Sequence, residues 1–167
     1  PSEGGFLSPA IISYKEFKGD SVIRQFASVM DIAPTILDIA NIEHPQNKYS
    51  GRNIHPIKGQ SILPMLINGD KPKLSNNRIT GWELFNRRAV RAGSWKITWI
   101  EKPYGKGRWV LYDLKNDPLE EDDLAATNPA KLKEMIALWD EYEKENGVII
   151  DQDLNLGYSG ENFHFKH

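Results

Sequence analysis

The chain contains no cysteine among its 167 residues. This absence excludes disulfide bonds, thiolate metal sites and a cysteine nucleophile within the chain. The sequence also lacks an apolar run of about 18 residues, the length that a membrane-spanning helix requires, so we expect no membrane span. The formal net charge is only −2, which gives no basic surface for nucleic acid, and we expect no nucleic-acid partner. The cellular compartment stays open.

Several motifs of catalysis and nucleotide binding are also absent. The sequence has no Gly-x-Ser-x-Gly string, no P-loop and no dinucleotide-binding fingerprint. What is present is ordinary: 40% hydrophobic and 26% charged residues, a composition typical of a folded globular protein rather than a disordered one.

The start of the chain has neither an initiator methionine nor a signal peptide nor a helix start signal. Residues 1–5, Pro-Ser-Glu-Gly-Gly, lead directly into the apolar run of residues 9–12. This run predicts a buried strand over residues 10–14, which would need neighbouring strands in a sheet covered by helices. We therefore expect the sequence to be the C-terminal piece of a larger protein.

Two helices are predicted in the first half of the chain. Asp31 and Pro34 both suit the first turn of a helix within residues 28–40, which should end at Asn41. A second, short helix is predicted over residues 61–68. The residues between the two helices are rich in proline, glycine and polar groups and indicate an irregular connection. The apolar face predicted for the first helix consists of Ile32, Ile36, Ile39 and Ala40.

The second half of the chain reads as an antiparallel sheet followed by a helix. Polar residues 70–77 are the predicted domain boundary. The strand runs that follow are joined by short connections, which suit antiparallel pairing because a parallel pair needs a long crossover. Asn128-Pro129 is a typical helix start, and Gly147 a typical end. The predicted strand runs are residues 78–85, residues 88–100 with a break at Gly93-Ser94, and residues 109–114.

Apolar residues recur along the predicted helix at the spacing of one helix face. We expect Leu132, Ile136 and Trp139 to pack against a sheet surface that carries Trp95, Ile97 and Tyr112. The aromatic residues could instead form a platform for a sugar, but their strand and helix periodicity favours a core. The stripe is Leu132, Met135, Ile136, Trp139 and Tyr142, and the aromatic cluster is Trp95, Trp99, Trp109, Tyr112 and Trp139.

Candidate metal ligands show no convincing pattern. The acidic stretch of residues 113–123 could hold a hard cation, yet Asp117-Pro118 is turn chemistry, and a solvated turn is the favoured interpretation. Residues 151–155 alternate like the start of a calcium loop but lack its glycine and its glutamate at the required places, so residues 151–167 are predicted to be a tail. The four histidines, His44, His55, His164 and His167, show no metal-ligand spacing.

Three arginines lie close together at residues 87, 88 and 91. Together they could bind an anion such as sulfate or phosphate. The favoured alternative is that they flank a sheet edge or pair with the acidic stretch.

In their order, these elements resemble the C-terminal third of the sulfatase family, most closely bacterial arylsulfatases. The resemblance covers residues 3 to about 148. It rests on an ordered set of short pieces: Glu3-Gly4-Gly5-Phe6-Leu7-Ser8-Pro9-Ala10-Ile11-Ile12, Val29 to Asp38, Gly59 to Leu66, Gly81-Trp82-Glu83-Leu84-Phe85, Ala89-Val90-Arg91 with Trp95-Lys96, and Leu111 to Leu124.

This resemblance implies a hydrolase of sulfate esters in the larger protein. The family uses a formylglycine, made from Cys or Ser in a Cys/Ser-x-Pro-x-Arg motif, and a divalent cation, usually calcium. This chain holds no such motif, so no catalytic residue and no metal ligand carries over onto it. The resemblance places Glu3, Gly4 and Gly5 next to the substrate cleft. The expected partners are the rest of the sulfatase chain and a sulfate ester.

The resemblance also implies a mixed fold class, α/β plus α+β. Residues 1–69 would end an alkaline-phosphatase-like α/β domain, and residues 70–150 would form a small antiparallel sheet with a packed C-terminal helix. The predicted role is structural support and a possible rim of the substrate cleft. The alternatives are a non-enzymatic interaction module and part of a related phosphoester or phosphonate hydrolase.

Overall fold

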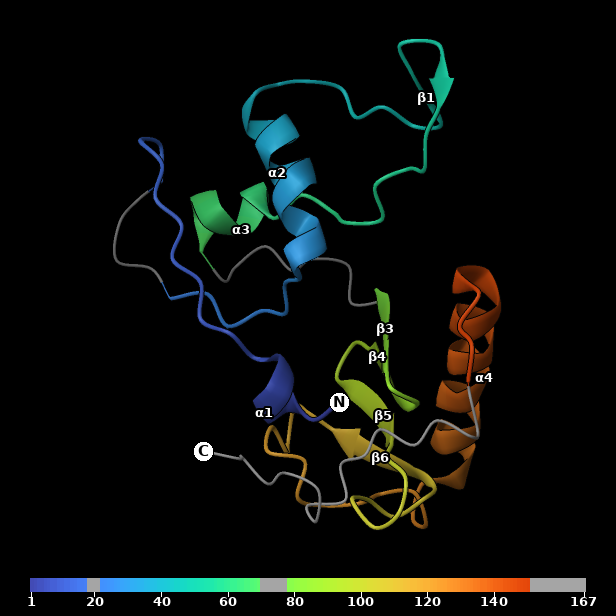
Figure 1. The fold of residues 1–167 in the computed structure, drawn as a ribbon. Helices are drawn as coiled ribbons and strands as arrows, with labels where there is room; N and C mark the ends of the chain where they lie inside the picture. The colour runs from blue at the N-terminus through green and yellow to red at the C-terminus, as the bar shows by residue number, and fades with distance from the viewer. Residues whose placement is uncertain (18–21, 70–77, 151–167) are drawn as a thin grey trace, which may run out of the picture. The chain divides into compact units, whose positions relative to one another are not determined.

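The computed structural model describes residues 1–17, 22–69 and 78–150. The chain divides into two compact units, coloured along the sequence in Figure 1. The sheet unit combines Pro1–Pro9 with Asn76–His167, and the helical unit is Ala10–Ser75. The first nine residues therefore fold with the C-terminal half of the chain, although more than sixty positions separate them in sequence.

The sheet unit is built on four antiparallel strands in the order β3-β4-β5-β6. Aromatic and β-branched side chains supply the strand preference. Phe85 and Asn86 join β3 to β4 with positive φ angles of 55° and 65°, the backbone of a tight hairpin turn. The predicted strand runs are thus confirmed, with these bounds: β3 Ile79–Leu84, β4 Arg87–Ala92, β5 Trp95–Trp99 and β6 Trp109–Asp113.

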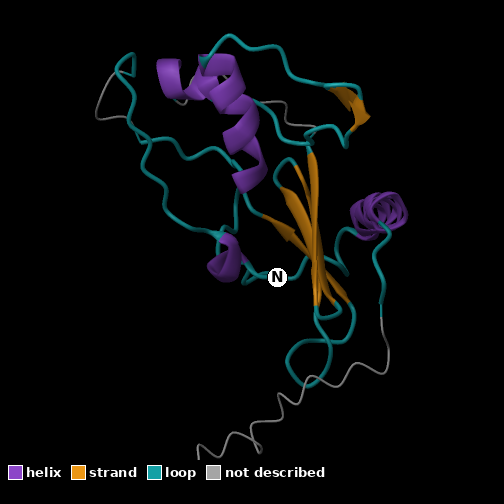
Figure 2. Cartoon of the chain, turned by 45° about the horizontal axis from the view of Figure 1, so that its top comes forward, coloured by secondary structure: helices purple, strands orange, loops and turns teal. Residues whose placement is uncertain are grey.

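One face of the sheet is apolar and is covered by helix α4, Pro129–Asn146. Figure 2 shows the sheet nearly edge-on, with α4 on one side and the short helix α1, Glu3–Phe6, on the other. Pairing of Val90 with Ile97, and of Ile97 with Leu111, lines these three side chains across the α4 face. Met135 and Trp139 of α4 are each 1% exposed and complete the core. The predicted helix and its packing on the sheet are confirmed.

The expectation that Tyr112 faces α4 is wrong. Tyr112 pairs directly with Lys96, and Leu111 with Ile97. Because successive side chains of a strand point to opposite faces, Tyr112 and Lys96 share the face opposite α4. Trp95 and Ile97 do lie on the α4 side. The aromatic cluster is therefore split between two faces.

The helical unit contains a short 3-10 helix, η1 (Val29–Asp31), that continues into α2 (Ile32–Ile39), and then α3 (Leu63–Asn68). Asp31 is fully buried, and its carboxylate accepts from the backbone N–H groups of Ser28 at 2.7 Å and Gln60 at 3.0 Å. It thereby caps η1 and ties α2 to the segment before α3. Both predicted helices are confirmed. Two short paired strands, β1 (Lys48–Tyr49) and β2 (Arg52–Asn53), interrupt the irregular connection.

Three local expectations are wrong. Residues 10–14 form no strand, because strand geometry requires a partner for backbone hydrogen bonds and none of the described strands pairs with them. The predicted apolar face of α2 is not buried: Ile32 is 53% and Ile36 59% exposed. The chain start, predicted to lack helix, carries α1. The predicted boundary at residues 70–77 lies outside the described residues.

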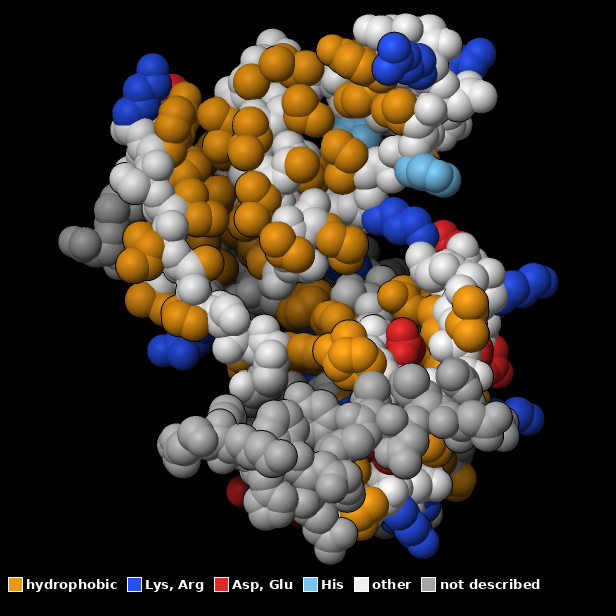
Figure 3. Space-filling model, in the orientation of Figure 1, with side chains coloured by type: hydrophobic (Ala, Val, Ile, Leu, Met, Phe, Trp, Pro, Cys, Tyr) orange, Lys and Arg blue, Asp and Glu red, His pale blue; other side chains and the backbone are white. Residues whose placement is uncertain are grey.

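The helical unit leaves many apolar side chains in contact with solvent. Figure 3, whose upper half contains α2 and α3, shows hydrophobic side chains gathered over these elements. Exposed large hydrophobic residues of this unit include Ile11, Val22, Val29, Ile32, Ile36, Ile42 and Tyr49. Its buried core is small and centres on Ile62, Met65 and Leu66.

We predict that Trp139→Ala destabilises the sheet unit by about 3–5 kcal/mol, because it empties the centre of the α4 interface. Urea unfolding followed by circular dichroism measures the change. Lys133→Ala, at an exposed position of the same helix, is the matched control and should change stability by no more than about 0.5 kcal/mol. A Trp139→Ala protein that unfolds like the wild type would show that α4 is not docked as described.

Candidate functional site: a buried ion cluster on the second face of the sheet

The face of the sheet opposite α4 carries a lysine at its centre. Lys96 is the second residue of β5, an interior strand of the sheet, and its side chain is 0% exposed. Its Nζ donates to Glu3 Oε1 at 2.7 Å and lies 2.7 Å from Glu120 Oε1. The two carboxylate side chains are themselves only 9% and 5% exposed. We call Lys96, Glu3, Glu120 and Arg91 the ion cluster.

Helix α1 brings Glu3 to this face of the sheet. The backbone N–H of Glu3 donates to Glu120 Oε2 at 2.8 Å, so the same residue is held by its backbone and by its side chain. One helical turn further, Phe6 stacks on Trp82 with ring centroids 4.7 Å apart. Lys96 Nζ lies 4.9 Å from the centre of the Phe6 ring, close enough for a cation–π interaction.

The ion cluster is balanced in charge, with two cations and two carboxylates. Arg91 NH1 lies 3.7 Å from Glu3 Oε2, and Arg91 Nε donates to the carbonyl of Gly93 at 3.1 Å. Burial lowers the pKa of Arg91, while the charges of Glu3 and Glu120 act in the opposite direction. Removing a charge from water costs several kcal/mol, and only good geometry with opposite charges offsets this cost. Each member therefore depends on the others.

The geometry of the cluster is that of a structural site. Its carboxylates are engaged by cations, which leaves them poorly suited to act as a base or nucleophile. Across residues 1–17, 22–69 and 78–150, no three His, Cys, Asp or Glu side chains come together as a potential metal site. Within the same ranges, no helix is long and apolar enough to cross a membrane.

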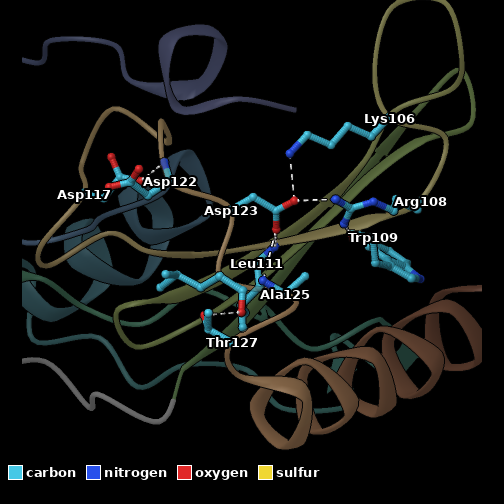
Figure 4. Close-up of polar contacts among 10 residues, drawn as sticks. Lys106, Arg108, Trp109, Leu111, Asp117, Asp122, Asp123, Ala125 and Thr127 are labelled. Carbon is cyan, nitrogen blue, oxygen red and sulfur yellow. Dashed lines mark hydrogen bonds and ion pairs between the residues drawn. The ribbon is translucent and has the colours of Figure 1, made fainter.

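The acidic stretch is more ordered than a solvated turn. Figure 4 shows Asp123 at its centre: Oδ2 accepts from Lys106 Nζ at 2.7 Å and from Arg108 NH2 at 2.8 Å, and Oδ1 accepts from the backbone N–H of Ala125 at 3.1 Å. Burial alone would raise the pKa of Asp123, but these hydrogen bonds outweigh it and lower the pKa to about 2. Asp117 accepts from the backbone of Asp122 at 3.0 Å.

The solvated-turn prediction is therefore wrong for Glu120 and Asp123. Glu120 points into the ion cluster, and Asp123 ties the stretch to β6 through a weak hydrogen bond of 3.4 Å from the backbone N–H of Leu111. The turn expected at Asp117-Pro118 is present. The loop is thus held at Glu120 and at Asp123, whose side chains are 5% and 13% exposed.

The three arginines do not converge on a common anion site. Arg87 forms a bidentate ion pair with Glu101, with NH2 to Oε1 at 2.8 Å, and this hydrogen bonding lowers the pKa of Glu101. Arg88 lies over the Trp99 ring at 4.3 Å, on the α4 face. Because strand neighbours point to opposite faces, Arg88 is separated from Arg87 and Arg91 by the sheet. Arg87 and Arg91 do pair with carboxylates, but with those of Glu101 and Glu3 and not with the acidic stretch that the favoured alternative named.

The structure separates the three residues predicted next to a cleft. Glu3 is buried in the ion cluster, whereas Gly4 and Gly5 are exposed. Lys96 and Glu120 were missed by sequence reasoning. The sequence offered one signal: Lys96 is the charged residue within a strand run of aromatic and β-branched residues. A lysine at such a position is equally typical of a strand residue that faces solvent. His44 and His55 lie in the helical unit; residues 151–155, His164 and His167 lie outside the described residues.

Comparison with known proteins defines the class to which this architecture belongs. Its fold is shared with the crystal structure of Ps i-CgsB, with a TM-score of 0.52 and 21% identity over 70% of this chain and 24% of that one. Residues 2–144 match the family described as N-sulphoglucosamine sulphohydrolase, C-terminal. The chain belongs to this family of sulfatase C-terminal regions.

Two curated relatives are similar over most of the chain. An uncharacterized sulfatase of Schizosaccharomyces pombe is 40% identical over 91% of this chain and 27% of its own length. Arylsulfatase K of Xenopus laevis is 28% identical over 80% of this chain and 25% of its own length. The chain thus spans about a quarter of these relatives. They come from a yeast and a frog, so the resemblance to sulfatases is confirmed, and the expected likeness to bacterial arylsulfatases is not.

We predict that Lys96→Met destabilises the sheet unit by about 3–5 kcal/mol, because it leaves two buried carboxylates without their shared cation. Lys115→Met, at an exposed position of the nearby loop, should change stability by no more than about 0.5 kcal/mol. Chemical denaturation measures both.

The double variant Lys96→Met/Glu120→Gln tests whether charge is the cause. It removes one of the two stranded carboxylates and leaves Glu3 beside Arg91, so it should be more stable than Lys96→Met alone. A double variant that is less stable would contradict the electrostatic account.

We predict that Asp123→Asn lowers the free energy of unfolding at pH 7 by about 1–2 kcal/mol. The effect is no larger because Lys106 and Arg108 are exposed, and solvent screens their attraction to Asp123. A carboxylate with a depressed pKa contributes stability above its unfolded pKa and loses it as pH falls through the folded pKa. The difference from wild type should therefore shrink between roughly pH 4 and pH 2. Asp140→Asn, exposed on α4, is the control; a pH-independent difference would refute the prediction.

Proposed function

We propose that this chain is the C-terminal portion of a sulfate ester hydrolase, in which it supports the catalytic domain and supplies no catalytic residue. The observation that carries the proposal is the family match over residues 2–144, combined with the quarter of each relative's length that the chain spans. The ion cluster adds support, because its buried charges are engaged with one another rather than directed at a ligand.

The domain organisation follows from the same proposal. Residues 1–69 end the alkaline-phosphatase-like α/β domain of the parent, although residues 1–9 pack with the sheet unit, and residues 70–150 are its C-terminal subdomain. The exposed apolar side chains of the helical unit suit a surface that the rest of that domain covers. Exposed Gly4 and Gly5, which follow buried Glu3, lie next to the substrate cleft of the parent.

The parent enzyme uses calcium and a formylglycine under this proposal. The residues present here do not fit either group. The described part of the chain brings no three potential metal ligands together, and Glu3 and Glu120 are engaged by Lys96. The sequence has neither cysteine nor a Ser-x-Pro-x-Arg string. Both groups would be held by the preceding part of the parent.

The proposal is tested by assaying the full-length protein and the isolated chain in parallel. We expect the full-length protein to hydrolyse para-nitrophenyl sulfate, and to prefer it to the corresponding phosphate and phosphonate esters. The isolated chain should show no turnover above background and no saturable binding of calcium at micromolar concentration, measured by calorimetry. Turnover by the isolated chain that survives repurification would contradict the proposal, as would a full-length protein that hydrolyses only phosphate or phosphonate esters.

A further inference from the structure

The ion cluster joins three segments that are far apart in sequence: α1, the centre of the sheet and the acidic loop. We propose that Lys96 and Glu120 are positioning residues for the substrate cleft, because they fix residues 1–9 on the sheet unit and so determine where Gly4 and Gly5 lie. This inference rests on the proposed function, which places these two glycines beside the cleft.

The contacts hold α1 at more than one point. Glu120 accepts from the backbone N–H of Glu3, while Lys96 donates to the Glu3 side chain. A single side-chain contact would let the segment swivel, whereas a backbone contact and a side-chain contact together set its orientation. The stack of Phe6 on Trp82 adds a third point, one helical turn away.

Burial makes these contacts effective at fixing position. Lys96 is 0% exposed and Glu120 only 5%, so their attraction is not weakened by water and salt as it is for a surface ion pair. Their geometry leaves little freedom, because any displacement of α1 would strand a charge without its partner. A hydrophobic contact of the same area would allow α1 to slide, since the hydrophobic effect is non-directional.

The core on the α4 face of the sheet includes no residue of α1. In this core, Trp139 of α4 packs against Val90, Ile97 and Leu111. Releasing residues 1–9 therefore affects the place of the segment more than the integrity of the sheet. This separation allows a positioning role to be distinguished from a purely structural one.

The experiment compares Glu120→Gln with Glu121→Gln in the full-length enzyme, using para-nitrophenyl sulfate. A glutamine at position 120 has one oxygen and one NH2 group, so its NH2 group would face either Lys96 or the backbone N–H of Glu3. Both of these groups are donors, so one of the two contacts of Glu120 is lost. Glu121 is exposed, and Glu121→Gln serves as the control. We expect Glu120→Gln to raise KM by roughly fivefold or more with kcat nearly unchanged, because a cleft is displaced without loss of a reacting group. A structural role alone would reduce the folded fraction, lowering kcat and leaving KM unchanged, and that result would overturn the inference.

Hydrogen exchange provides a readout that does not depend on activity. In Glu120→Gln the backbone amides of residues 2–8 should exchange about tenfold faster, while those of β4, β5 and α4 keep wild-type protection. Phe6→Ala, which leaves all four charges in place, should reproduce both effects, and exposed Leu7→Ala should reproduce neither. Unchanged exchange in residues 2–8, or faster exchange with an unchanged KM, would overturn the inference. A wild-type protein without sulfatase activity would instead refute the proposed function, and the exchange data would still decide whether Glu120 fixes the segment.

Discussion

The buried ammonium of Lys96 is the interaction on which the second face of the sheet depends. A lysine that an interior strand places out of contact with water is tolerated only when carboxylates replace the hydration of its ammonium group. Glu3 and Glu120 meet this requirement from opposite directions along the chain, 93 and 24 positions away. The contacts of Lys96 with these two carboxylates therefore hold residues 1–9 and the acidic loop on this face of the sheet.

The two faces of the sheet are stabilised by different interactions, apolar packing on one and buried ion pairs on the other. The α4 face is a continuous apolar core of Val90, Ile97, Leu111 and Trp139, which provides most of the burial and tolerates small adjustments. At Gly81 the approach is close, because a Cβ there would lie 2.5 Å from the Tyr142 ring. The opposite face relies on charge-assisted hydrogen bonds, which are directional and admit little displacement. Both faces stabilise the sheet unit, and the directional contacts of the second face also set the orientation of residues 1–9.

Sequence patterns predicted the elements whose signals are local. The strands and α4 followed from the two-residue and 3.6-residue periodicities, and Gly147, at φ 63°, ends α4 as its position indicates. The face of Tyr112 was missed because it depends on the register between β5 and β6, which local composition does not determine. The exposure of Ile32 and Ile36 was missed because periodicity shows that a helix has an apolar side and not what covers it.

The ion cluster itself was beyond sequence reasoning. Its members are separated by up to 117 positions, and each has a plausible ordinary interpretation alone: Glu3 in a loop, Lys96 on a solvent-facing strand position, Glu120 in a solvated turn. The cluster is recognised only when the structure shows these three side chains in contact. The family resemblance supplied the class of protein, since the ordered set of short motifs is specific where single motifs are not, but it assigned no role to these charges.

The most direct test of this account is an experimental structure of the full-length protein. The measured quantities are the distances from Lys96 Nζ to the carboxylate oxygens of Glu3 and Glu120. The account predicts that both lie within hydrogen-bonding distance, with residues 1–9 on the face opposite α4. A structure in which Glu3 leaves Lys96, and residues 1–9 lie away from the sheet, would contradict it.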